Sequence, residues 1–209
     1  MYVDGRLMDY IDDAASSKPA PGGGSVSAMV GALGTTMGSM AANFTIGKKK
    51  FAGVEGEVKG LLARIDAARA KLLALVDADV AAYGEVGAAY SMPKETEGEK
   101  LARSAAIKSA CGSAMGVPRR IMAESLEVLR ALSRLVDIAN PNLISDVGVA
   151  AIFARAALEG GRLNVEINLK SLAGDPAAAG VAEEVAERSA EAARLEDDVL
   201  RKVRTAIGG

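Results

Sequence analysis

Residues 21–51 read PGGGSVSAMVGALGTTMGSMAANFTIGKKKF, and this stretch decides how the rest of the chain is interpreted. No charged residue falls between Lys18 and Lys48, and three lysines then follow together. A glycine loop therefore leads into a helix of small residues, which carries a cluster of positive charge at its far end. This layout favours a site for an anionic small molecule over a plain core helix.

A transmembrane span is the alternative interpretation, because such a span needs about 20 mainly apolar residues. The stretch is rich in Gly, Ser, Thr and Asn, however, and these residues insert poorly compared with Leu, Ile, Phe and Val. A signal peptide would lie at the very N-terminus behind basic residues, and this stretch does not. The small residues Gly31, Gly34 and Gly38 instead allow close approach of a neighbouring helix. We therefore expect a buried central helix and no membrane role.

The composition sets limits on fold and chemistry. The chain has 209 residues, half of them hydrophobic and only 3% aromatic, which is typical of one domain of closely packed helices over residues 1–209. A net charge of -2 argues against nucleic-acid binding. The single Cys111 excludes an intrachain disulfide and predicts a reducing, cytoplasmic location. The chain has no histidine, which excludes Ser-His triads and His-ligated metals. Any catalysis must therefore use carboxylates, lysines, amides or hydroxyls.

The spacing of apolar residues predicts a succession of helices. We expect a short amphipathic helix over residues 4–15 and, after a Pro/Gly loop, a helix that Ser25 caps and that runs to about residue 46. A long helix then extends from about Val54 to the break at Met92-Pro93. Further boundaries are expected at a capping box Thr96–Glu99, a helix start at Pro118, a turn at Asn140-Pro141-Asn142 and a helix start at Asp175-Pro176.

Residues 163–170 alternate between apolar and polar side chains, which is a strand signature, but the sequence offers no partner strand. We predict a helix there, and hence an all-α fold, a single-domain bundle of long helices. The glycine-rich surface and the apolar stripe from Val181 to Val203 favour self-association into a homodimer. The core of a monomer explains both features nearly as well, so the two interpretations stay open.

Two aspartates lie on apolar helix faces. Asp79 comes three residues after Val76 and four before Tyr83, so its carboxylate is desolvated unless it is paired. Either a Lys or Arg from another helix forms a buried ion pair with it, or it is a functional group with a raised pKa. Asp146 shows the same pattern, but it also lies at a helix start, where an acidic residue interacts favourably with the helix dipole.

Amides and lysines are further candidates. Asn164 and Asn168 lie one helical turn apart and can present two amides side by side, although a solvated face is the alternative. The cluster Lys48, Lys49 and Lys50 is by default an exposed basic patch.

Five motifs occur in order along the chain: Pro21–Ser25 (PGGGS), Asn43–Phe51 (NFTIGKKKF), Met92-Pro93-Lys94 with Thr96, Asn142–Asp146 (NLISD) and Leu163–Asn168 (LNVEIN). With them the chain closely resembles the formimidoyltetrahydrofolate cyclodeaminase / methenyltetrahydrofolate cyclohydrolase family, from its first helix to about Leu172. Phe51 and Tyr83 stand where tyrosine and phenylalanine are usual in the family.

The resemblance implies an all-helical, dimeric enzyme that acts on one-carbon units carried by tetrahydrofolate. The formiminotransferase region of bifunctional members has no room in 209 residues, so we expect a free-standing cyclohydrolase or, as the alternative, a cyclodeaminase. Asp146 and Asp79 are the implied catalytic residues. The implied substrate-binding residues are Gly22, Gly23, Gly24, Ser25, Asn43, Lys48, Lys49, Lys50, Lys94, Asn142, Ser145, Asn164 and Asn168. We expect no metal and no cofactor besides the folate substrate.

This chemistry needs no histidine. A cyclohydrolase adds water to the cationic methenyl bridge of 5,10-methenyltetrahydrofolate, and a carboxylate can stabilise that cation and orient or deprotonate the water. A cyclodeaminase forms the same bridge from 5-formiminotetrahydrofolate and needs a general acid for the departing ammonia. A non-catalytic helical dimer that binds folate or a partner protein is the other class of function. Carboxylates on buried faces favour the enzyme, because a scaffold gains nothing from desolvated charges.

Overall fold

The computed structural model describes residues 1–170, 172 and 176–208, and within these ranges the regular secondary structure is helical. The predicted all-α bundle of long helices is thus confirmed. The α-helices are α1 (Leu7–Ala15), α2 (Gly23–Asn43), α3 (Glu55–Tyr90), α4 (Glu97–Ala114), α5 (Gly116–Ile138), α6 (Ile144–Lys170) and α7 (Pro176–Ala206). The 3-10 turns are η1 (Tyr2–Asp4), η2 (Lys49–Phe51) and η3 (Pro141–Leu143).

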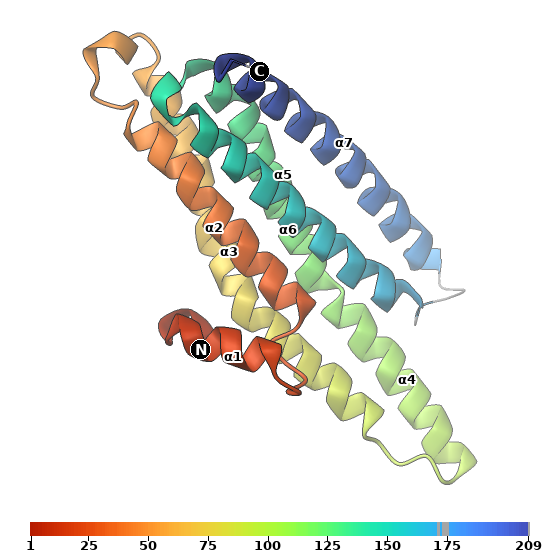
Figure 1. Cartoon of the computed structure of the whole chain (residues 1–209). Coiled ribbons are helices and arrows are strands. Elements are labelled where there is room, and N and C mark those ends of the chain that lie inside the picture. The colour runs from red at the N-terminus through yellow and green to blue at the C-terminus, as the bar shows by residue number, and fades with distance from the viewer. Residues whose placement is uncertain (171, 173–175, 209) are drawn as a thin grey trace.

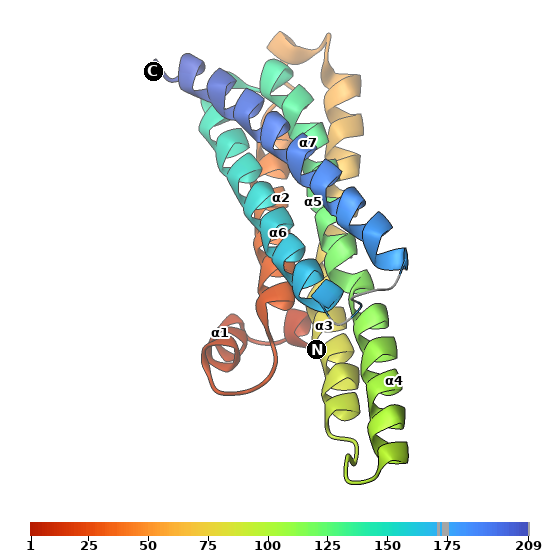
Figure 2. The ribbon, with the colours of Figure 1, turned by 90° about the vertical axis from the view of Figure 1, so that its right-hand side faces the viewer.

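Four helices form the body of the bundle, and a fifth covers one side of it. In Figure 1, α2 and α6 lie side by side in front of α3 and α5. Helix α7 packs on α5 and α6, as Figure 2 shows from the side. Helix α4 runs beside the lower part of α3, and α1 lies next to the lower end of α2 and the middle of α3. The outer face of the α2–α6 layer is left without a covering helix from the described residues.

The small residues of α2 serve its contact with α6. A Cβ atom added to Gly34 would lie 2.8 Å from the Cβ of Phe153, and one added to Gly31 would lie 3.1 Å from the Cβ of Ala157. The two helices therefore run antiparallel at close range. Helix α2 is less central than predicted, however, because its outward residue Leu33 and the following Phe44 are about half exposed.

The N-terminal boundaries differ from the prediction. Helix α1 begins at Leu7 rather than Asp4, since residues 2–4 form η1, and the N–H of Tyr2 donates to Asp77 Oδ1 of α3 at 2.7 Å. Helix α2 begins at Gly23, and Gly22 is its N-cap. The predicted Ser25 cap was wrong, because Ser25 lies inside the first turn with its side chain fully buried.

Other boundaries are confirmed. Thr96 and Glu99 form the predicted capping box of α4. Pro118 lies in the first turn of α5, which starts at Gly116. The turn at Asn140 is closed by its side-chain oxygen, which accepts the N–H of Asn142 at 3.1 Å. Residues 163–170 are helical, in the last two turns of α6. The predicted cap at Asp175 lies outside the described residues.

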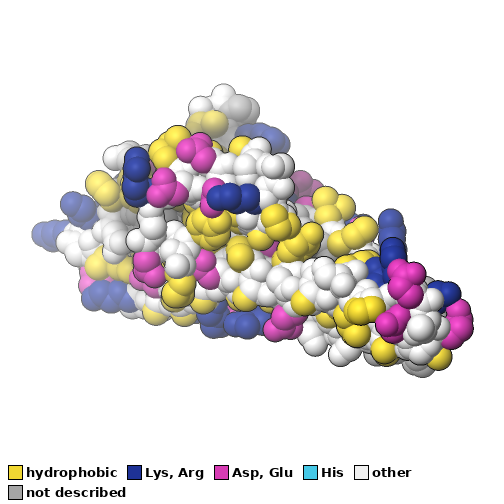
Figure 3. Space-filling view, turned by 90° about the horizontal axis from the view of Figure 1, so that it is seen from below, with side chains coloured by type: hydrophobic (Ala, Val, Ile, Leu, Met, Phe, Trp, Pro, Cys, Tyr) yellow, Lys and Arg dark blue, Asp and Glu magenta, His cyan; other side chains and the backbone are white. Residues whose placement is uncertain are grey.

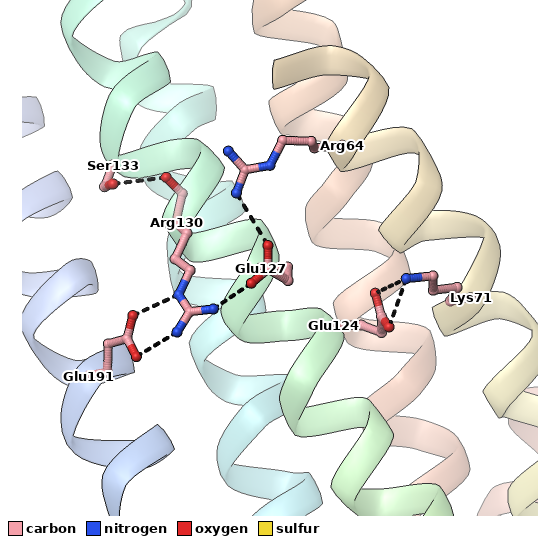
Figure 4. Close-up of polar contacts among 7 residues, drawn as sticks. All are labelled: Arg64, Lys71, Glu124, Glu127, Arg130, Ser133 and Glu191. Atoms are coloured by element: carbon pink, nitrogen blue, oxygen red, sulfur yellow. Dashed lines mark hydrogen bonds and ion pairs between the residues drawn. The ribbon is translucent and has the colours of Figure 1, made fainter. Parts of the chain in front are cut away.

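Ion pairs join α3, α5 and α7 on the side of the bundle away from α2. Arg130 of α5 holds Glu191 of α7 with two hydrogen bonds of 2.7 and 2.8 Å, and it also pairs with Glu127 (Figure 4). Glu127 in turn accepts from Arg64 of α3 at 3.2 Å. The two carboxylates raise the pKa of the Arg130 guanidinium. Exposed pairs of this kind contribute about 0.2–1 kcal/mol each.

None of the helices in the described part of the chain combines the length and the apolar character needed to cross a bilayer.

Candidate active site

Asp79 lies in the second half of α3, with its carboxylate against the N-terminus of α2. The backbone N–H of Ser25 donates to Asp79 Oδ2 at 2.8 Å. Ser25 is the third helical residue of α2, and its N–H is the donor that a capping side chain normally satisfies. The N-cap, Gly22, has no side chain for this, so Asp79 of α3 caps α2 instead.

Glycine at position 24 makes this contact possible. A Cβ atom added to Gly24 would lie 2.1 Å from Asp79 Oδ1 and 2.6 Å from Asp79 Cγ. Any larger residue would displace the carboxylate from the helix end. Gly24 is therefore needed for a close approach between two elements, whereas a Cβ atom at Gly22 would meet nothing within 4 Å.

Burial raises the pKa of the Asp79 carboxyl, and the hydrogen bond from Ser25 opposes this shift. No salt bridge to Asp79 is found among the described residues, so the alternative of a buried ion pair is not realised. A carboxyl group with a raised pKa inside a cleft can bind a cation or exchange a proton closer to neutral pH than an ordinary aspartate.

A second layer of contacts supports the carboxylate. The Ser25 hydroxyl is hydrogen-bonded to the Tyr10 hydroxyl at 3.1 Å, and both side chains are buried. Burial raises the pKa of Tyr10, so its hydroxyl stays neutral. Tyr10 thereby joins α1 to the turn of α2 that holds Asp79.

A cavity of about 310 Å³, which we call the Asp79 pocket, opens beside this carboxylate. It lies between the start of α2, the second half of α3, the α4–α5 junction and the end of α6. Its lining comprises Pro19, Gly22, Gly23, Asp79, Ala82, Tyr83, Val86, Tyr90, Cys111, Ala114, Pro118, Asn164, Ile167 and Asn168. The view from below (Figure 3) shows apolar side chains between groups of charged ones at this end of the molecule.

Two amides of α6, those of Asn164 and Asn168, line the pocket. Asn164 Nδ2 donates to the Gly160 carbonyl and Asn168 Nδ2 to the Asn164 carbonyl, both at 2.8 Å. These bonds fix the amides on the helix one turn apart, as predicted. A Cβ atom added to Gly23 would lie 3.3 Å from Asn164 Nδ2, so the amide lies directly against the α2 backbone.

The remaining predicted residues lie elsewhere. Seven of them lie at the opposite end of the bundle, which we call the lysine end. Asp146 is half-buried there, and the exposed residues are Asn43, Lys48, Lys49, Lys50, Asn142 and Ser145. There the Asn140 N–H donates to Thr45 Oγ1 at 2.8 Å, which joins the end of α2 to η3. Lys94 is exposed in the α3–α4 connection, outside the pocket lining.

The two ends are far apart within one chain. Asp146 and Asn164 are 18 residues apart on α6, which at 1.5 Å per residue is about 27 Å. One chain therefore does not bring Asp79, Asp146 and the lysines into a single cluster, contrary to what their shared sequence motifs led us to expect.

Several pocket residues were missed by the sequence analysis. Tyr83, Val86 and Tyr90 follow Asp79 at steps of four, seven and eleven residues, and so share its helix face. This spacing could have identified them from the sequence. Cys111 and Ile167 carry no such signal, because their place depends on how α4 and α6 pack.

Comparisons with known proteins agree with this architecture. The sequence model of the formiminotransferase-cyclodeaminase family matches residues 6–197. A methenyltetrahydrofolate cyclohydrolase from Methylorubrum extorquens is 37% identical over 96% of this chain and 97% of its own length. The formimidoyltransferase-cyclodeaminase of Rattus norvegicus is 33% identical over 83% of this chain, which matches 32% of the rat protein.

A solved structure shares the fold. The formiminotetrahydrofolate cyclodeaminase from Thermotoga maritima superposes with a TM-score of 0.88 and 30% identity, covering 99% of this chain and all of that one. The chain therefore belongs to the formiminotransferase-cyclodeaminase family.

Proposed function

We propose that the protein is a methenyltetrahydrofolate cyclohydrolase, which interconverts 5,10-methenyltetrahydrofolate and 10-formyltetrahydrofolate. The observation that carries the proposal is Asp79, a partly desolvated carboxylate without an ion-pair partner in the described residues, at the wall of a pocket lined by two amides and two tyrosines. The near full-length match to the Methylorubrum enzyme supports the same reaction.

The pocket suits a cationic, flat substrate. A carboxylate beside the methenyl bridge stabilises its positive charge and orients the attacking water, and it accepts a proton from that water as the C–O bond forms. Asn164 and Asn168 provide amide oxygens and N–H groups for the edge of the pterin. Tyr83 and Tyr90 offer aromatic faces to the ring system.

Formimidoyltetrahydrofolate cyclodeaminase is the second candidate activity. It is favoured by the raised pKa of Asp79, because a carboxyl group that keeps its proton closer to neutral pH can donate it to the departing ammonia. The Thermotoga protein of the same fold carries that name. The same carboxyl group would serve both reactions in opposite protonation states.

The lysine end has a role in the same proposal. Lys48, Lys49 and Lys50 bind the glutamate carboxylates of the folate, and Asn142, Ser145 and Asp146 lie at the same end of the bundle. The protein acts as a homodimer in the cytoplasm. Its free thiol, Cys111, fits the reducing conditions of that compartment.

Ultraviolet absorption tests the proposal directly. Methenyltetrahydrofolate has its own absorption band, which fades on hydrolysis and grows on cyclodeamination. Each folate is supplied in turn, and the change is compared with the spontaneous rate. We expect fading with 5,10-methenyltetrahydrofolate, and Asp79→Asn should lower the enzymatic rate by about 10²–10⁴-fold. Asp12→Asn, an exposed aspartate of α1, is the matched control and should keep the full rate. A wild-type protein that alters neither folate would refute the proposal.

A further inference from the structure

The end of α3 forms one wall of the Asp79 pocket. Tyr83, Val86 and Tyr90 line the pocket from this helix, and Tyr90 is its last residue. Tyr90 is 50% exposed, so packing alone does not hold its ring. The last carbonyl groups of a helix have no partner within the helix, and other groups must satisfy them. The position of this ring therefore depends on what holds the end of α3.

Arg103 of α4 holds that end. Its Nε and Nη2 atoms both donate to the Tyr90 carbonyl, at 3.2 and 3.0 Å. The same guanidinium lies over the Tyr90 ring, with Cζ 5.6 Å from the ring centroid. A cation is favourable both at a helix C-terminus and over an aromatic face. One side chain thus holds the backbone and the ring of Tyr90 together.

The guanidinium of Arg103 is not engaged by a carboxylate. Among the described residues Arg103 forms no salt bridge, whereas Lys100, one turn earlier on α4, pairs with Glu97 at 2.6 Å. Arg103 itself is half-buried and is not part of the pocket lining. Its effect on a ligand in the pocket is therefore exerted through Tyr90.

The two helix ends beside the pocket are held in the same way, each by a charged side chain of another helix. Asp79 of α3 accepts from the first turn of α2, and Arg103 of α4 donates to the last residue of α3. An aromatic ring with a cation over one face can still stack on a flat ligand with the other. This inference rests on the proposed function, which places a pterin in the pocket. We infer that Arg103 is a positioning residue, which holds the Tyr90 ring as a preorganised surface on which the pterin of the folate stacks.

Arg103→Gln tests this role through KM. The variant loses the planar donor fork and the charge over the ring, so the ring is no longer held in place. A looser stacking surface weakens binding of the substrate and of the transition state alike. KM for 5,10-methenyltetrahydrofolate should therefore rise by about 3- to 10-fold while kcat stays close to the wild-type value. Lys100→Gln removes the same charge from the same helix, so it is the matched control and should keep the wild-type KM. An unchanged KM in Arg103→Gln would overturn the inference.

A double-mutant cycle separates a positioning role from a general structural one. Tyr90→Leu removes the aromatic ring. If Arg103 acts through that ring, adding Arg103→Gln to Tyr90→Leu should raise KM no further. Equal increases in the wild-type and Tyr90→Leu backgrounds would show that Arg103 acts elsewhere, and would contradict the inference.

Hydrogen exchange tests the contact without any folate. The Ser91 N–H donates to the Gly87 carbonyl at 3.1 Å and closes the last turn of α3. In Arg103→Gln this amide should exchange about 10-fold faster than in the wild type or in Lys100→Gln, since the helix end is held less firmly. Equal exchange rates in the wild type and Arg103→Gln would overturn the inference. Wild-type protein inactive on both folates refutes the proposed function instead, and the exchange rates still decide whether Arg103 holds the end of α3.

Discussion

Gly24→Ala isolates the contribution of the contact between Asp79 and the N-terminus of α2. The new Cβ atom would lie 2.1 Å from Asp79 Oδ1, whereas an ordinary contact is at least 3.4 Å. The carboxylate must therefore move by about 1 Å or more, and it then loses the hydrogen bond from the Ser25 N–H. A displacement of this size in a reacting group costs about 10²-fold in rate.

The expected effect on stability is much smaller. Loss of a hydrogen bond to a charged group costs about 1.5–3 kcal/mol. Alanine in place of glycine in a helix returns about 0.5–1 kcal/mol. We therefore expect a net destabilisation of about 0.5–2.5 kcal/mol, which leaves the protein folded while its activity falls by about 10²-fold.

Two measurements separate these effects. Urea unfolding followed by circular dichroism gives the stability, and the decay of the methenyltetrahydrofolate band gives kcat/KM. Gly60→Ala on α3 is the control, because a Cβ atom there meets nothing within 4 Å. If Gly24→Ala kept the wild-type rate, the position of Asp79 at the helix end would be irrelevant to catalysis, and the proposed role of this contact would be wrong.

Three further predictions concern charge and packing. Burial raises the pKa of Asp79 in the folded protein above its ordinary 3.8. The wild-type protein should therefore lose stability relative to Asp79→Asn as the pH rises from 3.8 to the folded-state pKa. Urea unfolding midpoints at a series of acidic pH values check this. Gly34→Ala should lower the free energy of unfolding by about 1–3 kcal/mol through its clash with Phe153, while Gly56→Ala, with open space around it, should not. Arg130→Ala removes ion pairs with Glu127 of α5 and Glu191 of α7, so it should lower the free energy of unfolding by about 1–2 kcal/mol and leave kcat/KM unchanged. The loss should be smaller at high salt, and equal losses at low and high salt would contradict an ionic origin.

The fold could be predicted from the sequence because its signals are local. Thr96 and Glu99 are enough to predict the capping box of α4, and Met92-Pro93 is enough to predict the end of α3. The helix over residues 163–170 is harder to predict, since alternation over eight residues also fits a strand. The lack of a partner strand in the sequence favours the helix, and the structure confirms it. The start of α2 was misplaced because Ser25 is a good cap by type, whereas the cap in the structure comes from Asp79, 54 residues later.

The site could be predicted only in part, for a related reason. Asp79 stood out because a carboxylate on an apolar face is costly, and Asn164 and Asn168 because they are one turn apart. Motif order, however, does not report distance in space. Asp146 and the lysines lie at the other end of a bundle whose long helices run for more than about 30 Å at 1.5 Å per residue. That separation follows from the 18 residues between Asp146 and Asn164 on α6, not from the order of the motifs.

The capping role of Asp79 also bears on the catalytic role that we propose for its carboxyl group. Burial favours its protonated form, and the Ser25 N–H together with the positive end of the α2 dipole favours its charged form. These influences on the pKa of Asp79 oppose one another, and burial is the larger of the two. Weakening either influence moves the pKa in a known direction: without the Ser25 hydrogen bond it rises further. Gly24→Ala should therefore shift the acidic limb of the kcat/KM profile to higher pH as well as lower the rate, and an unshifted limb would show that another group titrates there.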